Sequence, residues 1–143
     1  MRIGIIGAGK VGTTLGAGWA RAGHEVVYGS REPGGPPPHA GSSVASIRDA
    51  ASAEVVVLAT PWAAVPDALA AAGDLSGRVL IDVTNPLGPG FKLTHAHSTS
   101  GAEEVARLSP GARVVKAFNT TGAENLADSH YAHGQPMMPV AGD

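Results

Sequence analysis

A glycine-rich hexapeptide near the amino terminus has a spacing that could bind phosphates. The sequence Gly7-Ala8-Gly9-Lys10-Val11-Gly12 matches G-x-G-x-x-G and lies between an apolar run and an alanine-rich segment, a context that makes this weak motif informative. In such a turn Gly7 permits the tight bend, Gly9 lets the backbone approach a pyrophosphate, and Gly12 allows close packing of the next helix. The helix amino terminus offers free N–H groups to phosphates. The motif therefore predicts dinucleotide binding, and the alternative is a glycine-rich turn without a ligand.

The residues after the second predicted strand indicate which dinucleotide binds. A site for NAD generally places Asp or Glu there, about 20 residues beyond the glycines, to bind the ribose hydroxyls. This sequence has Gly29-Ser30-Arg31 instead. A hydroxyl and a guanidinium can bind the 2′-phosphate of NADP, which a carboxylate would repel. We predict a preference for NADP(H), the alternative being that Arg31 is only a solvated charge. Glu32 is the main objection, and strand alternation would aim it away from Arg31 if the strand geometry persists to that residue.

Small and polar residues follow three further predicted strands. Ligands of open α/β sheets lie beyond the carboxyl ends of the strands, so these residues are candidates for contacts with a ribose, a diphosphate or a nicotinamide. They are Thr60-Pro61-Trp62, Thr84-Asn85-Pro86 and Asn119-Thr120-Thr121. The same residue types are favoured in turns and helix caps, so a structural role is an equal alternative for each.

Other catalytic chemistries lack their motifs. His95, His97, His130 and His133 do not have the spacing of a helical metal site, and we interpret them as loop histidines without function. The sequence has no cysteine for a thiol nucleophile and no G-x-S-x-G elbow for a hydrolase. We therefore predict no metal and no catalytic side chain.

Alternating apolar and alanine-rich stretches predict the elements that position these residues. Several Val- and Ile-rich runs are apolar at successive residues, which is typical of parallel strands buried on both faces. Strands are predicted over residues 2–6, 25–29, 54–59, 78–83, 113–118 and 137–142, and helices over 11–22, 44–51, 63–72, 102–108 and 122–127. The alternation predicts an α/β fold: a Rossmann-type doubly wound, mainly parallel sheet with helices on both faces. Three consecutive prolines make residues 31–43 an expected exposed loop.

Composition limits the classes of partner. With 143 residues, 43% hydrophobic and 15% charged, the chain is expected to fold as one nucleotide-binding domain, residues 1–143. A formal net charge of -2 gives no basic stripe for nucleic acid, and no apolar stretch is long enough to span a membrane. We expect a cytoplasmic protein that acts on small-molecule redox cofactors.

Longer strings of sequence carry a resemblance to a known family. The strings VLATPW, LIDVTNPLGPG, TSGAEEVARL and VVKAFNTTGAENLAD follow the glycine motif and Ser30-Arg31 in order. With them the chain resembles, over nearly its whole length, the coenzyme F420-dependent NADP oxidoreductases. The resemblance implies that NADP(H) lies over the glycine turn and that the deazaflavin coenzyme F420 stacks near its nicotinamide for direct hydride transfer. In such a reaction the cofactors carry the chemistry, so no acid–base dyad is needed.

The resemblance also implies which residues bind. It assigns Gly7, Gly9, Lys10, Val11 and Gly12 to the phosphate loop, Ser30 and Arg31 to the 2′-phosphate, Thr60, Pro61 and Trp62 to the ribose loop, and Asn85, Pro86, Ala117, Phe118 and Asn119 to the nicotinamide and deazaflavin side. It leaves a homodimer open.

Two departures from the family pattern leave alternative functions open. The proline-rich loop stands where the family has a helix, and the family continues past Asp143 with elements that help to build the second-ligand pocket. That C-terminal extension is expected to be absent here, with NADP(H) bound but F420 turned over poorly. The alternatives are an NADPH-dependent reductase of another acceptor, such as a flavin, a metal chelate or a small imine, and a non-catalytic NADP-binding module.

Overall fold

Seven strands form one sheet whose order reverses beside β1. The computed structural model describes residues 1–128, 130, 134 and 137–142. The strand order is β3-β2-β1-β4-β5-β6-β7, and all neighbours are parallel except β6 and β7. The strands are β1 (Arg2–Ile6), β2 (Glu25–Ser30), β3 (Ser42–Ser46), β4 (Val55–Leu58), β5 (Val79–Asp82), β6 (Arg113–Lys116) and β7 (Ala141–Gly142). The Rossmann-type, mainly parallel sheet predicted from the sequence is confirmed.

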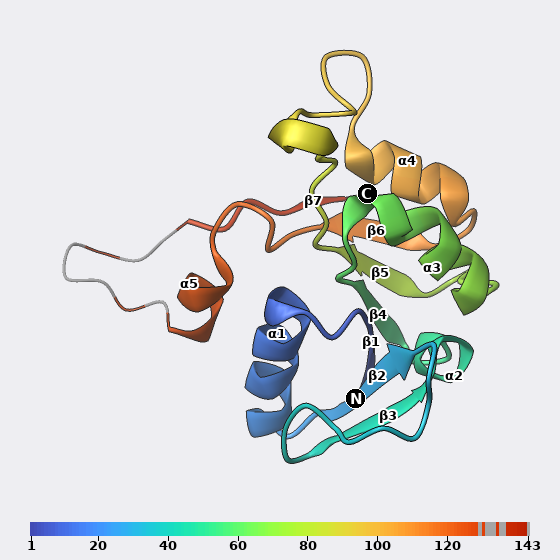
Figure 1. Ribbon diagram of the computed structural model, residues 1–143, viewed down its shortest axis with the longest axis vertical. Coiled ribbons are helices and arrows are strands. Elements are labelled where there is room, and N and C mark those ends of the chain that lie inside the picture. The colour runs from blue at the N-terminus through green and yellow to red at the C-terminus, as the bar shows by residue number, and fades with distance from the viewer. Residues whose placement is uncertain (129, 131–133, 135–136, 143) are drawn as a thin grey trace.

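Helices cover both faces of the sheet (Figure 1). One face carries α1 (Lys10–Arg21) and α5 (Ala123–Ala127), and the other carries α2 (Ile47–Ala51), α3 (Val65–Ala72) and α4 (Gly101–Leu108). Short 3₁₀ turns occupy Trp62–Ala64 and Pro89–Phe91. Each face has its own buried cluster. On one face the strand residues Ile3, Ile5, Val26 and Tyr28 pack with Leu15 of α1. On the other face Ile6, Leu58 and Leu80 pack with Leu69 of α3 and Val105 of α4. Strands buried on both faces explain the continuous apolar runs.

The predicted helix over residues 44–51 is wrong in its first half. Residues Ser42–Ser46 form β3, which pairs in parallel with β2, and only Ile47–Ala51 are helical. The Ser46 hydroxyl accepts a hydrogen bond of 3.0 Å from the backbone N–H of Asp49, which fixes the helix start at residue 47. The preceding residues satisfy the backbone groups of β2, a tertiary contact that local composition does not reveal.

The loop after β2 and the last strand also differ from the prediction. The expected exposed loop over residues 31–43 ends at residue 41, because Ser42 and Ser43 belong to β3. The predicted strand over residues 137–142 is reduced to β7, which pairs antiparallel with the end of β6.

Close packing of α1 on the sheet depends on a small residue opposite a tyrosine. A Cβ added at Gly16 would lie 2.0 Å from the hydroxyl oxygen of Tyr28. That hydroxyl lies 3.3 Å from the carbonyl oxygen of Gly12 and 2.9 Å from Nε2 of His39. Burial raises the pKa of Tyr28 to about 12. The hydroxyl is protonated at neutral pH, as an ordinary tyrosine also is, and burial extends this protonated range to higher pH.

We predict that Gly16→Ala destabilises the fold by about 1–3 kcal/mol, because the added methyl overpacks the buried Tyr28 hydroxyl. Gly18→Ala is the matched control on the same helix, since a Cβ there would meet only Arg21 Nη2, at 4.0 Å. The control should instead stabilise the protein by about 0.5–1 kcal/mol. Urea unfolding followed by circular dichroism measures both, and equal free energies of unfolding for the two variants would contradict the packing argument.

Candidate dinucleotide-binding site

The glycine motif forms the turn between β1 and α1, and two of its glycines are required by close backbone contacts. Gly7 has φ +112°, and a Cβ there would lie 2.5 Å from the carbonyl oxygen of Ala59. A Cβ at Gly12 would lie 2.1 Å from the carbonyl oxygen of Gly7. The first and third glycines thus hold the turn against α1 and the end of β4, as the motif predicts.

Gly9, the second glycine, faces open space. It is the N-cap residue of α1, and a Cβ built on it would meet no described atom within 4 Å. Among the described residues, no side chain caps this helix end and no acidic residue lies in its first turn. Its N–H groups and the positive end of its dipole are therefore available to an anion.

A cleft of about 490 Å³ opens between the end of β2 and the start of α3. We call it the larger cleft. It is lined by Ile6, Gly7, Ala8, Tyr28, Gly29, Ser30, Arg31, Glu32, Gly35, Pro36, Pro38, Val44, Ile47, Thr60, Pro61, Ala64, Asp67, Ala68 and Ala71. The structure thus brings Ser30 and Arg31 onto the same cleft as the first glycine of the motif. Gly35, Pro36 and Pro38 of the proline-rich loop form part of its wall.

The condition on which the expected orientation of Glu32 depended is not met. It required β2 to continue beyond Ser30, but the strand ends there, and both Arg31 and Glu32 line the larger cleft. The backbone N–H of Glu32 donates a 3.0 Å hydrogen bond to the Ser30 hydroxyl oxygen, which leaves the hydroxyl proton for another acceptor. Within the described part of the chain, Arg31 forms no ion pair with Glu32.

A smaller cleft of about 270 Å³ lies on the other side of the glycine turn. It is lined by Gly9, Lys10, Val11, Ala59, Thr60, Pro61, Trp62, Val83, Thr84 and Asn85. Thr60 and Pro61 line both clefts, so the two meet where the strand order reverses. Ligands of doubly wound sheets bind at such a reversal.

One polar atom at this meeting point lacks a partner. The Thr60 hydroxyl oxygen is buried and, among the described residues, has no hydrogen-bond partner. Buried polar atoms in native proteins are nearly always paired. Together with the uncapped start of α1, this unsatisfied hydroxyl fits a site completed by a polar ligand such as a dinucleotide.

Among the residues predicted for the far side of the site, one lines the smaller cleft and others pack inside the protein. Asn85 lines the smaller cleft, its amide donates to the carbonyl oxygen of Asn119 at 3.2 Å, and the Asn119 amide donates to Asn85 Oδ1 at 3.2 Å. Phe118 instead packs edge-on against Trp19, with ring centroids 6.2 Å apart. Ala117 is buried. Neither Pro86 nor residues 117–119 are among the described residues that line the two clefts.

Trp62 forms the outer part of the smaller cleft. It begins the 3₁₀ turn after β4, and its ring packs edge-on against His95 at a centroid distance of 5.0 Å. The irregular segment after β5 therefore folds back over the end of β4. This contact gives His95 a packing role.

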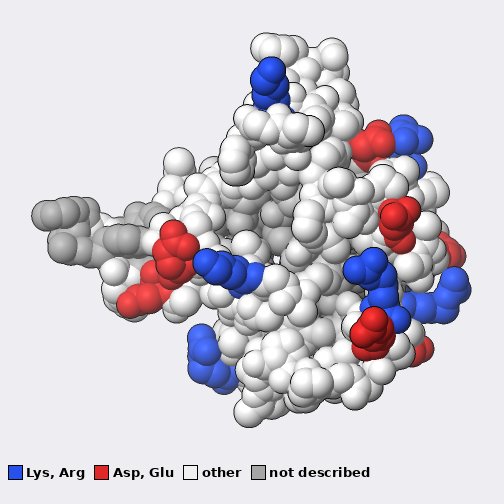
Figure 2. All heavy atoms as spheres, in the orientation of Figure 1, with Lys and Arg blue, Asp and Glu red and all other residues white. Residues whose placement is uncertain are grey.

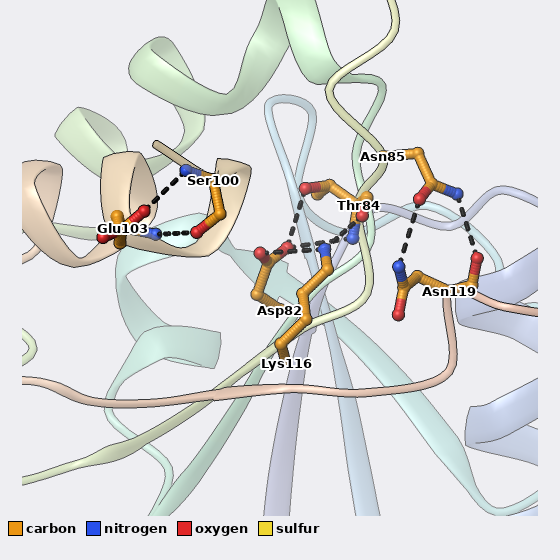
Figure 3. Close-up of polar contacts among 7 residues, drawn as sticks. All are labelled: Asp82, Thr84, Asn85, Ser100, Glu103, Lys116 and Asn119. Atoms are coloured by element: carbon orange, nitrogen blue, oxygen red, sulfur yellow. Dashed lines mark hydrogen bonds and ion pairs between the residues drawn. The ribbon is translucent and has the colours of Figure 1, made fainter. Parts of the chain in front are cut away.

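Sequence reasoning missed a buried polar network beside the smaller cleft (Figure 3). Asp82 ends β5 and is fully buried, and Lys116 ends β6 and forms a 3.0 Å ion pair with it. Thr84 donates two hydrogen bonds to the same carboxylate. The sequence held part of the signal, because Asp82 and Lys116 each lie within an apolar run and a buried charge requires a partner, but nothing in the sequence pairs these two residues.

The described residues contain no group of three or more His, Asp or Glu side chains that could hold a metal ion, and His133 lies outside them. On the described part of the face in Figure 2, Lys and Arg side chains are scattered among acidic ones rather than gathered in a band. No helix in the described ranges is long and apolar enough to cross a membrane.

Comparison with known proteins agrees with this geometry. The family described as NADP oxidoreductase, coenzyme F420-dependent, matches residues 2–86. A protein from Arthrobacter sp. FB24, provisionally assigned as an F420-dependent NADP reductase, is 36% identical with a TM-score of 0.90, and the match covers 100% of this chain and 74% of that one. The hypothetical protein SMa0349 from Sinorhizobium meliloti is 31% identical with a TM-score of 0.83, covering 100% of this chain and 73% of that one.

More distant structures share the fold alone. A reductive aminase from Aspergillus terreus in complex with NADPH and ethyl levulinate is 23% identical with a TM-score of 0.67, over 87% of this chain and 42% of that one. No curated protein matches the chain. The family match covers more than half of the chain, on the segment that holds the glycine turn, Ser30-Arg31 and Thr60. The chain therefore belongs to the family of coenzyme F420-dependent NADP oxidoreductases, and it is an NADP-dependent oxidoreductase.

Proposed function

We propose that this chain transfers a hydride between NADP(H) and the deazaflavin coenzyme F420. The observation that carries the proposal is the pair of clefts meeting at Thr60, with a guanidinium at one end and an uncapped helix start between them. The family match and the Arthrobacter relative support F420 as the second cofactor. When bound, NADPH supplies the hydride and oxidised F420 accepts it.

The side chains of the larger cleft supply the selection of NADP(H). Arg31 and Ser30 would bind the 2′-phosphate, since a guanidinium and a hydroxyl offer charge-assisted hydrogen bonds. Gly7, Gly9, Lys10, Val11 and Gly12 would hold the pyrophosphate through the N–H groups and dipole of α1. Glu32 and Asp67 also line this cleft, so Arg31 provides positive charge among carboxylates.

The smaller cleft would hold the nicotinamide half. With the pyrophosphate at the central turn and the adenosine on the β2 side, the second nucleoside must extend toward β5 and β6. Thr60, Pro61 and Trp62 would line the ribose, and Asn85 with Asn119 would lie beside the nicotinamide and F420. Pro86, Ala117 and Phe118 would support these contacts from behind. These side chains align the two cofactors and exclude water, and the proposal assigns none of them a proton transfer.

The proposal is tested by mixing the protein with NADPH and oxidised F420 and following the absorbance of both. We expect coupled loss of both absorbances. Parallel reactions contain a flavin, a ferric chelate or a cyclic imine in place of F420. Faster turnover of any of these than of F420 would replace the proposed acceptor, and no NADPH oxidation in any reaction would contradict the proposal.

We predict that Gly9→Val abolishes binding of NADPH and NADH while the protein remains folded. The side chain would occupy the open space beside the start of α1, where a Cβ meets no described protein atom, and would block the pyrophosphate. Fluorescence titration measures binding, and circular dichroism measures folding. A folded Gly9→Val protein that retains NADPH affinity would show that the nucleotide binds elsewhere.

We predict that Arg31→Ala weakens NADPH binding by roughly ten- to a hundred-fold, because a hydrogen bond to a charged group contributes about 1.5–3 kcal/mol. NADH binding should be nearly unchanged, since NADH lacks the 2′-phosphate. Arg21→Ala, at an exposed arginine of α1 outside both clefts, is the control for a general loss of positive charge. An equal loss of NADPH and NADH affinity in calorimetric titrations would overturn the role of Arg31.

A further inference from the structure

The buried network of Asp82, Thr84 and Lys116 is larger than an ion pair. Thr84 donates to Asp82 Oδ1 through its backbone N–H at 2.9 Å and through its hydroxyl at 2.7 Å. Lys116 Nζ donates to Asp82 Oδ2 at 3.0 Å and also to the carbonyl oxygen of Thr84. The backbone of Thr84 is therefore held at both its N–H and its carbonyl group. The residue held is the one that precedes Asn85.

The network joins two connections that are distant in the sequence. Asp82 and Lys116 are register partners at the carboxyl ends of the parallel strands β5 and β6. Just beyond them, the amides of Asn85 and Asn119 join the same two connections by reciprocal hydrogen bonds (Figure 3). A buried ionic layer thus underlies an exposed amide layer, and the amide layer borders the smaller cleft.

Stability alone is a poor explanation for this arrangement. Asp82 is 0% exposed and the Lys116 side chain is 16% exposed, so both charges have lost much of their hydration. Apolar residues of similar volume often replace such pairs without loss of stability. What an apolar pair could not do is hold the N–H and carbonyl group of Thr84 in one conformation.

We propose that Asp82, Thr84 and Lys116 are positioning residues that fix the loops after β5 and β6 on the nicotinamide side of the site. They set how the nicotinamide half of NADP(H) is held, and they leave the adenosine half, bound on the β2 side, unaffected. The expected effect on hydride transfer rests on the proposed function, whereas the expected effect on binding requires only that the chain binds NADP(H).

The test uses Asp82→Asn/Lys116→Met. Lys116→Met alone would leave a buried carboxylate without its cation, which is strongly destabilising. The double variant removes both charges together, and the amide oxygen that replaces the carboxylate can still accept the hydrogen bonds of Thr84. The matched control is Glu25→Gln, which breaks the 3.4 Å ion pair between Arg2 and Glu25 at the opposite end of the same sheet. Circular dichroism and thermal unfolding verify that both variants are folded.

The binding measurement compares NADPH with 2′,5′-ADP, which has the adenosine half and its phosphate but no nicotinamide. In the double variant we expect the Kd for 2′,5′-ADP to stay within about twofold of the wild-type value. The Kd for NADPH should rise about tenfold, which is the effect expected from losing one or two hydrogen bonds. The control variant should bind both as the wild type does. An unchanged NADPH Kd, or an equal loss for both ligands, would overturn the proposal.

The kinetic measurement separates this proposal from the proposed function. At saturating NADPH, the folded double variant should reduce F420 about a hundred-fold more slowly than the wild type, since a small misplacement of the reacting groups has an effect of that order. A kcat equal to that of the wild type would also overturn the positioning role. If the wild type itself reduces no F420, the proposed acceptor is wrong, and the comparison of NADPH with 2′,5′-ADP still decides the positioning role.

Discussion

The site depends on how closely α1 approaches the sheet at the glycine turn. The Cα of Gly12 lies against the carbonyl group of Gly7, Gly7 lies against the backbone of Ala59, and neither contact leaves space for a Cβ. These contacts bring the start of α1 beside the ends of β1 and β4, so its N–H groups face the point where the strand order reverses. Both clefts are lined in part by residues of this turn and lie on its two sides. A longer distance between helix and sheet would separate the uncapped start of α1 from Thr60.

The architecture of the sheet was predictable because its signals are local. Strands buried on both faces read as continuous apolar runs, and the glycine motif fixes the first crossover. The prediction was wrong where the signal is not local. Residues Ser42–Ser46 lack the composition of a strand, and they form β3 because β2 offers them backbone partners. The orientation of Glu32 was not predictable for a different reason: Glu32 lies beyond the end of β2, where strand alternation no longer fixes the direction of a side chain.

The sequence predicts that the glycine turn and the end of β2 belong to one site, and the structure brings Gly7 and Arg31 to one cleft. The residues predicted for the far side agree less well with the prediction, because Phe118 packs against Trp19 and Ala117 is buried. Asp82 and Lys116 lie 34 positions apart in the sequence, and only the parallel register of β5 and β6 makes them neighbours. No local pattern in a single sequence reveals contacts between elements that are distant in the chain.

The proline-rich loop has a thermodynamic consequence for ligand binding. Pro36 and Pro38 line the larger cleft, and each proline ring locks its own φ, so this wall has few backbone conformations even without a helix. His39 joins the end of the loop to the buried Tyr28 hydroxyl at 2.9 Å, which anchors it to the sheet. A binding surface whose conformational freedom is already restricted loses little entropy when a ligand arrives. The prolines thus restrict the backbone torsions of this wall, so that a ligand bound in the larger cleft would order little additional backbone there.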